Sequence, residues 1–167
     1  FDYLSNFTKW RPYEYRVRVC VDGELYPLPI NRDTINKFFN VNLKTEEETQ
    51  NFLDKKKVKI ENPKNSEEEV LSKIGKEIYE KFFKNYTIKQ WGIDPKKLEP
   101  SVSARIPIRV NTDDRYFTDK YQAMPKDGYS KLFENILKSK NITLKLNTDF
   151  NNISANYKKM IYTGCID

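Results

Sequence analysis

The sequence predicts an α+β fold in which a helical domain interrupts an antiparallel sheet. Three observations support this prediction: an alternating apolar and polar run surrounds Asp22-Gly23, helix-like segments follow it, and two short apolar runs stand near the carboxyl end. A chain of 167 residues is long enough for one domain, or two small ones, to bury a core without disulfide or metal support.

Residues 15–30, YRVRVCVDGELYPLPI, predict a β-hairpin. Apolar and polar side chains alternate on both sides of Asp22-Gly23, and this pair tolerates the positive φ angles of a two-residue turn. Pro27 and Pro29 cannot donate ladder hydrogen bonds, so the second strand is expected to lie at an edge or to leave the sheet there. The preceding residues, FDYLSNFTKW, look like part of a helix.

Two short helices are predicted next. Thr34 can cap a helix that runs through Phe39. Thr45-Glu46-Glu47-Glu48 is a capping box, in which the hydroxyl and the third carboxylate each accept a hydrogen bond from a backbone N–H, and its helix should end near Lys56. Residues 57–65 are polar and contain a proline, which predicts a loop.

The best predicted helix begins at a second capping-box sequence, Ser66-Glu67-Glu68-Glu69. Its apolar residues recur at every fourth position and therefore share one face: Val70, Ile74, Ile78 and Phe82, with Leu71 and Phe83 widening the stripe.

The rest of the chain is predicted to be a loop, a helix and two strands. Residues 92–114 contain three prolines and no sustained period, so we expect a long loop. The segment MPKDGYSKLFENILKS predicts a turn at Asp127-Gly128 and then a helix. The runs ITLKLN (142–147) and KKMIYTG (158–164) predict two closing strands. In the helix after Asp127-Gly128, the residues expected to point inward are Leu132, Phe133, Ile136 and Leu137.

Composition excludes several classes of site. Thirty Lys and Arg against 24 Asp and Glu leave a net charge of +6, spread along the chain, which favours an anionic partner. Without histidine and with two distant cysteines, we expect no metal site and no His-dependent triad. The cysteine pattern also fits a reducing compartment. No run is apolar enough for a membrane span or a signal peptide, so we expect a soluble, intracellular protein. The start at Phe1 suggests a piece of a longer protein.

The segment NYTIKQWG (85–92) places two rings and two polar side chains at the end of the best helix. In the commoner interpretation, which composition alone favours, Phe82 is core and Tyr86 and Trp91 cover the helix end. In the functional interpretation the rings form a stacking platform for a planar base, and Thr87 and Gln90 contact its polar edge.

Two arginines in ARIPIRV, Arg105 and Arg109, offer planar donor forks that suit phosphate oxygens. Solvated surface charge is the commoner fate of arginine, but the apolar neighbours require this loop to pack against something. Further along, Asp113, Asp114 and Asp119 could form a carboxylate pair for acid and base chemistry, although surface solvation is the commoner outcome.

Several blocks of the sequence resemble the UDP-galactopyranose mutase family. They are INRDTIN, IGKEIYEKFFKNYTIKQWG, ARIPIRVNTDDRYFTDKYQAMPKDGYSKLFE, LNTDF and IYTGCID. The resemblance implies a parent with an FAD-binding doubly wound α/β domain, a helical domain and an antiparallel sheet domain. It divides this chain into residues 1–32 (helix end and hairpin), 33–98 (helical domain), 99–115 (mobile-loop crossover) and 116–167 (rest of the sheet domain, then the start of the return to the FAD domain).

The resemblance also implies roles for single residues. Arg105 falls on the mobile-loop arginine that closes onto the diphosphate, and is the implied catalytic residue. Tyr116 falls on a tyrosine that contacts the phosphate region, and Tyr15 stands where relatives tend to carry His or Asn near the sugar. The uridine-binding segment corresponds to Phe82, Tyr86, Thr87, Gln90 and Trp91, with Tyr86 stacked on uracil.

By the same resemblance, reduced FAD is the covalent catalyst that interconverts UDP-galactopyranose and UDP-galactofuranose. The glycine-rich fingerprint GxGxxG is absent from these residues, so we expect FAD in the full-length protein, and neither FAD nor mutase activity in this piece alone. The resemblance implies a cytoplasmic enzyme with no nucleic-acid partner, and is compatible with a homodimer of the full-length protein.

Two other classes of function remain open. One is a non-catalytic module that binds nucleotide sugars or nucleic acid, since a basic, aromatic-rich domain can stack bases without chemistry. The other is a structural interaction domain in which Tyr86 and Trp91 are core residues.

Overall fold

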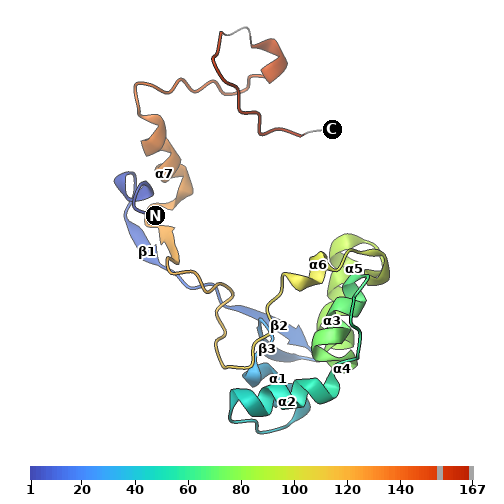
Figure 1. Cartoon of the computed structure of the whole chain (residues 1–167). Helices are drawn as coiled ribbons and strands as arrows, with labels where there is room; N and C mark the ends of the chain where they lie inside the picture. The colour runs from blue at the N-terminus through green and yellow to red at the C-terminus, as the bar shows by residue number, and fades with distance from the viewer. Residues whose placement is uncertain (154–155, 166–167) are drawn as a thin grey trace. The chain divides into compact units, whose positions relative to one another are not determined.

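The computed structural model describes residues 1–153 and 156–165, and combines helices with small antiparallel sheets, consistent with the predicted α+β class (Figure 1). The chain divides into two compact units. One consists of residues 12–123, and the other of the described residues among 1–11 and 124–167. The predicted division of the chain into residues 1–32, 33–98, 99–115 and 116–167 stays a prediction.

The predicted hairpin is confirmed. Strands β2 (Val17–Val21) and β3 (Glu24–Leu28) pair antiparallel, and Asp22 and Gly23 have φ angles of 51° and 84°. Both angles are positive, as the two-residue turn between strands with right-handed twist requires. Strand β3 ends directly before Pro29, in agreement with the expectation from the prolines. In the register, Val17 lies opposite Leu28 and Val21 opposite Glu24.

Helix α1 (Arg32–Phe39) forms where a helix was predicted, but the cap assigned to Thr34 was wrong. The buried side chain of Asn31 accepts the hydrogen bond from the Thr34 N–H at 3.0 Å. The Thr34 hydroxyl instead donates to the Pro27 carbonyl at 2.8 Å. The helix therefore begins three residues earlier, with Asn31 in place of Thr34 as its cap, and its first turn is tied to the hairpin.

Helix α2 (Glu46–Lys56) has the predicted capping box and the predicted end. The Glu48 N–H donates to the Thr45 hydroxyl at 3.1 Å, and the Thr45 N–H donates to the Glu48 carboxylate at 3.2 Å. Hydrogen bonds from the Lys44 and Thr45 N–H groups lower the pKa of Glu48. Sequence alone sufficed here because every participant lies within one helical turn.

Helix α3 (Ser66–Ile74) is capped one residue earlier than predicted. The Asn65 side chain, not that of Ser66, accepts the Glu68 N–H at 2.9 Å. The Ser66 hydroxyl is buried and hydrogen-bonds to the Ser103 hydroxyl, far away in sequence. Asn and Ser are comparable as N-cap residues. Because the Ser66 hydroxyl is engaged by Ser103, Asn65 caps the helix.

The long helix is not continuous, which corrects the prediction. It breaks at Gly75 and resumes as α4 (Lys76–Ile78), a π-helical segment η2 (Tyr79–Lys84) and α5 (Asn85–Trp91). At Gly75 the φ angle is 81°, and a Cβ atom would lie 2.2 Å from the Lys56 carbonyl oxygen. The close approach of α2 therefore requires glycine at this position.

The predicted apolar stripe survives the break in the helix. Its four residues, Val70, Ile74, Ile78 and Phe82, are all buried in the core of the 12–123 unit. The Phe82 ring lies edge-on to Tyr26 and to Phe38, with both centroid distances 5.2 Å. The helical segment is thereby joined to the hairpin and to α1.

The crossover after α5 contains more structure than the predicted loop. It includes a 3-10 turn η3 (Pro95–Lys97) and helix α6 (Ser101–Ala104), and Ile108 forms a parallel bridge with Ile30. The expectation that it packs against something is confirmed, since its apolar residues Ile106, Ile108 and Val110 lie against the core.

The unit of residues 1–11 and 124–167 contains helix α7 (Gly128–Leu137) and all but one residue each of the paired strands β1 (Trp10–Pro12) and β4 (Ala123–Pro125). The predicted amino-terminal helix was wrong: the chain makes one 3-10 turn, η1 (Leu4–Asn6), and then extends into β1. Pairing with β4 and stacking of the Phe1 and Trp10 rings at 4.8 Å outweigh the local helical pattern.

Helix α7 follows the predicted turn, and its Leu132 is buried as expected. Phe133, predicted to point inward, is 57% exposed, which corrects that assignment. Successive helix positions are about 100° apart, so neighbours 132 and 133 cannot both face a narrow contact.

The two predicted closing strands are absent from the described residues. Residues 142–147 and 158–164 form no regular element, and the one element between them is a 3-10 turn η4 (Phe150–Asn152). Ile161 is 90% exposed and Leu146 is 72% exposed. An apolar run shows which face a strand would bury, but a strand also needs a neighbour for its N–H and C=O groups.

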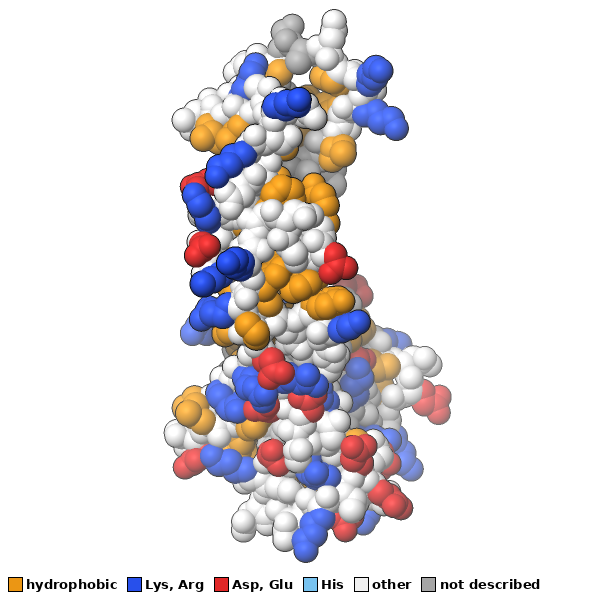
Figure 2. Space-filling view, turned by 90° about the vertical axis from the view of Figure 1, so that its left-hand side faces the viewer, with side chains coloured by type: hydrophobic (Ala, Val, Ile, Leu, Met, Phe, Trp, Pro, Cys, Tyr) orange, Lys and Arg blue, Asp and Glu red, His pale blue; other side chains and the backbone are white. Residues whose placement is uncertain are grey.

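On the face shown in Figure 2, lysine and arginine side chains are scattered among acidic ones. This distribution agrees with the expectation that the positive excess is not gathered in one tract. Within the described residues, no helix is long and apolar enough to cross a membrane.

Candidate functional site

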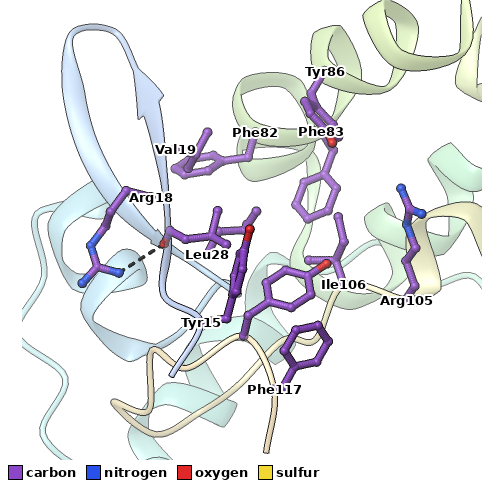
Figure 3. Close-up of a pocket in the computed structure, with 12 residues that line it drawn as sticks. Tyr15, Arg18, Val19, Leu28, Phe82, Phe83, Tyr86, Arg105, Ile106 and Phe117 are labelled. Carbon is purple, nitrogen blue, oxygen red and sulfur yellow. Dashed lines mark hydrogen bonds between the residues drawn. The ribbon is translucent and has the colours of Figure 1, made fainter. Parts of the chain in front are cut away.

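A pocket of about 500 Å³ opens between the hairpin, the π-helical segment and the crossover (Figure 3). All of its lining residues belong to the 12–123 unit. Its floor is apolar, and its rim carries tyrosines and two arginines. The lining comprises Tyr15, Val17, Arg18, Val19 and Leu28 of the hairpin region, Phe82, Phe83 and Tyr86 of the helical segment, and Arg105, Ile106, Tyr116 and Phe117 of the crossover.

The π-helical segment supplies the floor of the pocket. Phe82 and Phe83 are both buried, and Tyr86, one turn later on α5, is 53% exposed. A π-helical turn contains an extra residue, which changes the direction of the side chains that follow it. The ring of Tyr86 therefore keeps an exposed surface above an apolar floor, an arrangement that suits a planar ligand.

Arg105 lies at the rim, directly after α6. The neighbouring Ser103 is buried against Ser66, and Ile106 packs on the core, so the backbone on both sides of Arg105 is anchored. The Arg105 side chain is exposed, and among the described residues no carboxylate lies within ion-pair distance of it. Its positive charge is thus available to an anionic ligand.

Arg18, the other arginine of the lining, is already neutralised. Its guanidinium donates to the Asp114 carboxylate at 2.6 Å, and Asp114 also pairs with Arg16. Figure 3 shows the Arg18 guanidinium directed away from the rings of Tyr15 and Phe117. Of the two guanidiniums that line the pocket, Arg105 is therefore the one suited to bind an anion.

Tyr116 and Phe117 form a wall together with Tyr15. The Tyr116 N–H donates to the Tyr15 carbonyl at 2.6 Å, which fixes the crossover to the hairpin. The three rings meet edge-on, with centroid distances of 5.0 Å between Tyr116 and Phe117 and 6.5 Å between Tyr15 and Tyr116. This wall therefore combines two tyrosine rings with one phenylalanine ring.

The structure brings together four of the seven residues that the sequence singled out: Phe82, Tyr86, Arg105 and Tyr116 line this pocket. The other three belong to α5 and do not line it. Thr87 is buried, Gln90 is exposed, and Trp91 is 47% exposed. The side chains of Tyr86 and Trp91 are therefore not core, as the structural interpretation of the aromatic cluster would require.

Sequence reasoning missed most of the apolar lining. Val17 and Val19 could have been predicted to line the pocket together. They lie two residues apart on β2, and alternate residues of a strand point to the same face of the sheet. Phe83 and Ile106 had no local signal that distinguishes a pocket floor from ordinary core. Phe117 depends on the pairing of residues 115 and 116 with the hairpin.

Asp113 and Asp114, two of the three candidates for acid and base chemistry, are instead bound to arginines. The Asp113 carboxylate accepts hydrogen bonds from the Arg115 side chain at 2.8 and 3.0 Å and from its backbone N–H at 3.1 Å. These bonds hold the pKa of Asp113 well below its usual range. A carboxylate that stays ionised near neutral pH is a poor proton donor.

This low pKa predicts a pH dependence of stability. Because the folded state depresses the pKa of Asp113, the stabilisation is fully present above the unfolded pKa, about 3.9, and is lost as pH falls towards the folded value. We expect the difference in Tm between the wild-type protein and Asp113→Asn to be constant above about pH 5 and to shrink below about pH 4. Thermal unfolding followed by circular dichroism measures it, and a difference that grows on acidification would contradict the assignment.

Comparisons with known proteins agree with these features. Residues 81–167 match the family model described as UDP-galactopyranose mutase. Over the whole chain, the sequence is 40% identical to a probable UDP-galactopyranose mutase of Klebsiella pneumoniae and 34% identical to a dTDP-fucopyranose mutase of Escherichia coli. Over 98% of the chain it is 26% identical to a UDP-galactopyranose mutase of Mycoplasma pneumoniae. The chain spans 44%, 46% and 42% of these relatives, respectively.

Proposed function

The chain belongs to the UDP-galactopyranose mutase family, and on that premise we propose that its pocket binds the nucleoside diphosphate of a nucleotide sugar. The enzyme that carries the chain would interconvert UDP-galactopyranose and UDP-galactofuranose. Similarity to the Klebsiella pneumoniae relative over the whole chain supports this substrate.

One observation carries the proposal: an unpaired guanidinium and an exposed aromatic ring line the same apolar pocket. A pyrimidine can stack on Tyr86 above Phe82, and the diphosphate can accept hydrogen bonds from the planar fork of Arg105. Arg105 is the catalytic residue in this proposal, because it would stabilise the charge that develops on the departing diphosphate. The Tyr116 hydroxyl would donate to the phosphate region.

Thr87, Gln90 and Trp91 are proposed base contacts that come from the sequence. Gln90 follows Tyr86 by four residues on α5, so the two share a side of the helix. Trp91 has enough exposed ring to contact a ligand at the end of α5. Thr87 is buried, so a direct contact between its hydroxyl and a base would require α5 to shift.

FAD, which the family implies, does not fit the residues of this chain. Only five glycines are present, no GxGxxG occurs, and the sheets of the described residues have two strands each. A dinucleotide site of that kind needs a glycine-rich turn between a parallel strand and a helix. The contribution proposed for this chain is therefore binding and charge stabilisation. Reduced FAD belongs to the proposal for the full-length protein.

A second substrate is favoured by the Escherichia coli relative, which is described as a dTDP-fucopyranose mutase. Thymine differs from uracil by a methyl group, and the pocket floor of Val19, Leu28, Phe82 and Phe83 is apolar enough to bury it. Turnover of UDP-galactopyranose and dTDP-fucopyranose by the full-length protein, measured side by side, decides between the two.

The proposed site is tested by binding of UDP, dTDP and ADP, measured by calorimetry and by tryptophan fluorescence. We expect both pyrimidine nucleotides to bind more tightly than ADP. Tyr86→Leu should weaken UDP binding by about 1–3 kcal/mol, the usual contribution of base stacking. The matched control is Tyr129→Leu, which removes a similarly exposed helical tyrosine outside the pocket and should change nothing.

Two outcomes would contradict the proposal. Equal affinity for UDP and ADP, with a steep fall of affinity for single-stranded nucleic acid as salt rises, would indicate a nucleic-acid binding module. Unchanged fluorescence and no heat of binding with any of the nucleotides would favour a structural interaction domain.

A further inference from the structure

Arg109 is the second arginine of the ARIPIRV segment, and it does not line the pocket. Its backbone is fixed next to the hairpin, because the Arg109 N–H donates to the Ile30 carbonyl at 2.9 Å and Ile108 forms a parallel bridge with Ile30. Its side chain is only 12% exposed. A guanidinium this far removed from water is costly unless most of its N–H groups find acceptors.

The acceptors are backbone carbonyls of the segment that follows. One Arg109 nitrogen, Nη1, donates to the carbonyls of Asp113, at 3.1 Å, and Arg115, and Nη2 donates to the Tyr116 carbonyl at 3.4 Å. The Asp113 carboxylate, 3.8 Å from Nη1, adds charge attraction. Three carbonyls of the segment 113–116 therefore surround a single guanidinium that is largely removed from water.

This arrangement fixes the backbone of Tyr116 on two sides. Its carbonyl accepts from Arg109, and its N–H donates to the Tyr15 carbonyl at 2.6 Å. The Tyr116 ring then stands in the pocket wall against Tyr15 and Phe117. We propose that Arg109 is a positioning residue, which holds Tyr116 in the pocket wall without touching the ligand. The effect on ligand binding rests on the proposed function.

The geometry also explains why this position requires arginine. The planar guanidinium reaches several carbonyls at once, whereas a lysine ammonium is a point donor on a flexible stem. Arg109→Lys keeps the positive charge and should retain the fold, but it cannot make the same set of hydrogen bonds. Arg109→Gln removes the charge as well.

The first test needs no ligand and measures hydrogen exchange at the Tyr116 amide by nuclear magnetic resonance. In Arg109→Lys and Arg109→Gln we expect exchange of this amide to speed up by about tenfold or more, while amides of α2 and α3 keep their protection. The control is Lys97→Gln, which removes an exposed charge from η3. Unchanged exchange at Tyr116 in both Arg109 variants would overturn the inference.

The second test is a double-mutant cycle on UDP affinity. We expect Arg109→Lys to weaken binding by about tenfold in the wild-type background and not at all in a Tyr116→Ala background, because Arg109 acts through Tyr116. Equal losses in both backgrounds would show that Arg109 does not act through Tyr116. If the wild-type protein binds neither UDP nor dTDP, the proposed function fails, and the exchange of the Tyr116 amide alone decides the role of Arg109.

Discussion

Arg105→Ala is expected to lower the turnover of the full-length enzyme by about 10²–10³-fold, the usual loss when one donor to a developing negative charge is removed. The free energy of unfolding should change by less than about 0.5 kcal/mol, because the side chain is exposed and pairs with no carboxylate among the described residues. Steady-state kinetics with either nucleotide sugar, together with thermal unfolding, measures both quantities.

Two further variants isolate the cause of the Arg105 effect. Arg105→Lys keeps the charge but loses the planar fork, and should fall between wild type and Arg105→Ala. Lys89→Ala removes one positive charge from exposed α5, outside the pocket lining, and should leave turnover nearly unchanged. Turnover close to that of wild type in Arg105→Ala would refute the assigned role, whatever the two controls show.

Gly75→Ala is expected to destabilise the fold more than any other glycine-to-alanine substitution in the 12–123 unit. The added Cβ would lie 2.2 Å from the Lys56 carbonyl oxygen and 2.8 Å from its carbon, both backbone atoms, at a φ angle of 81°. Real Cβ atoms do not approach backbone so closely, so α2 and α3 would have to separate. We expect a loss of about 4 kcal/mol or more, placing the change among the exceptional single mutations.

Gly92→Ala is a control for a positive φ angle without a close contact. Gly92 also has a positive φ angle, 71°, but no atom lies within 4 Å of the added Cβ. Its cost should be limited to the left-handed backbone, about 1 kcal/mol. Gly75 has a ψ angle of −179°, in a region that only glycine adopts readily, whereas Gly92 has a ψ angle of 4°, in the left-handed helical region. The difference between the two variants in thermal unfolding therefore measures the clash together with the extra backbone strain at residue 75, and 1 kcal/mol shifts Tm by about 2–4 °C at this chain length. Equal shifts would contradict the role given to the Lys56 contact.

The predicted elements that held were those whose partners lie within a few residues. The Asp22-Gly23 turn, the Thr45 capping box and the apolar stripe on α3 to η2 each depend on neighbours along the chain. The predicted elements that failed needed a distant partner. Residues 142–147 and 158–164 have the apolar content of strands, but no described segment pairs with them.

The candidate site divides in the same way. The sequence could single out Tyr86 and Arg105, because a ring after an amphipathic helix and an arginine among apolar residues are local patterns. These local patterns did not distinguish Arg105 from Arg109, and only the family resemblance gave Arg105 a ligand role. The structure shows how they differ. The Arg109 guanidinium donates to the carbonyls of Asp113, Arg115 and Tyr116, and that of Arg105 is left open beside the pocket.

By itself, the sequence determined the α+β class, the hairpin and the face that the long helical segment buries, because turn chemistry and hydrophobic periodicity act over short stretches of chain. The tertiary structure decided where that segment breaks, which residue caps α3 and which of the two pocket arginines, Arg18 or Arg105, is free to meet an anion. Those outcomes depend on contacts such as Lys56 with Gly75, Ser66 with Ser103 and Arg18 with Asp114, which join residues remote in sequence.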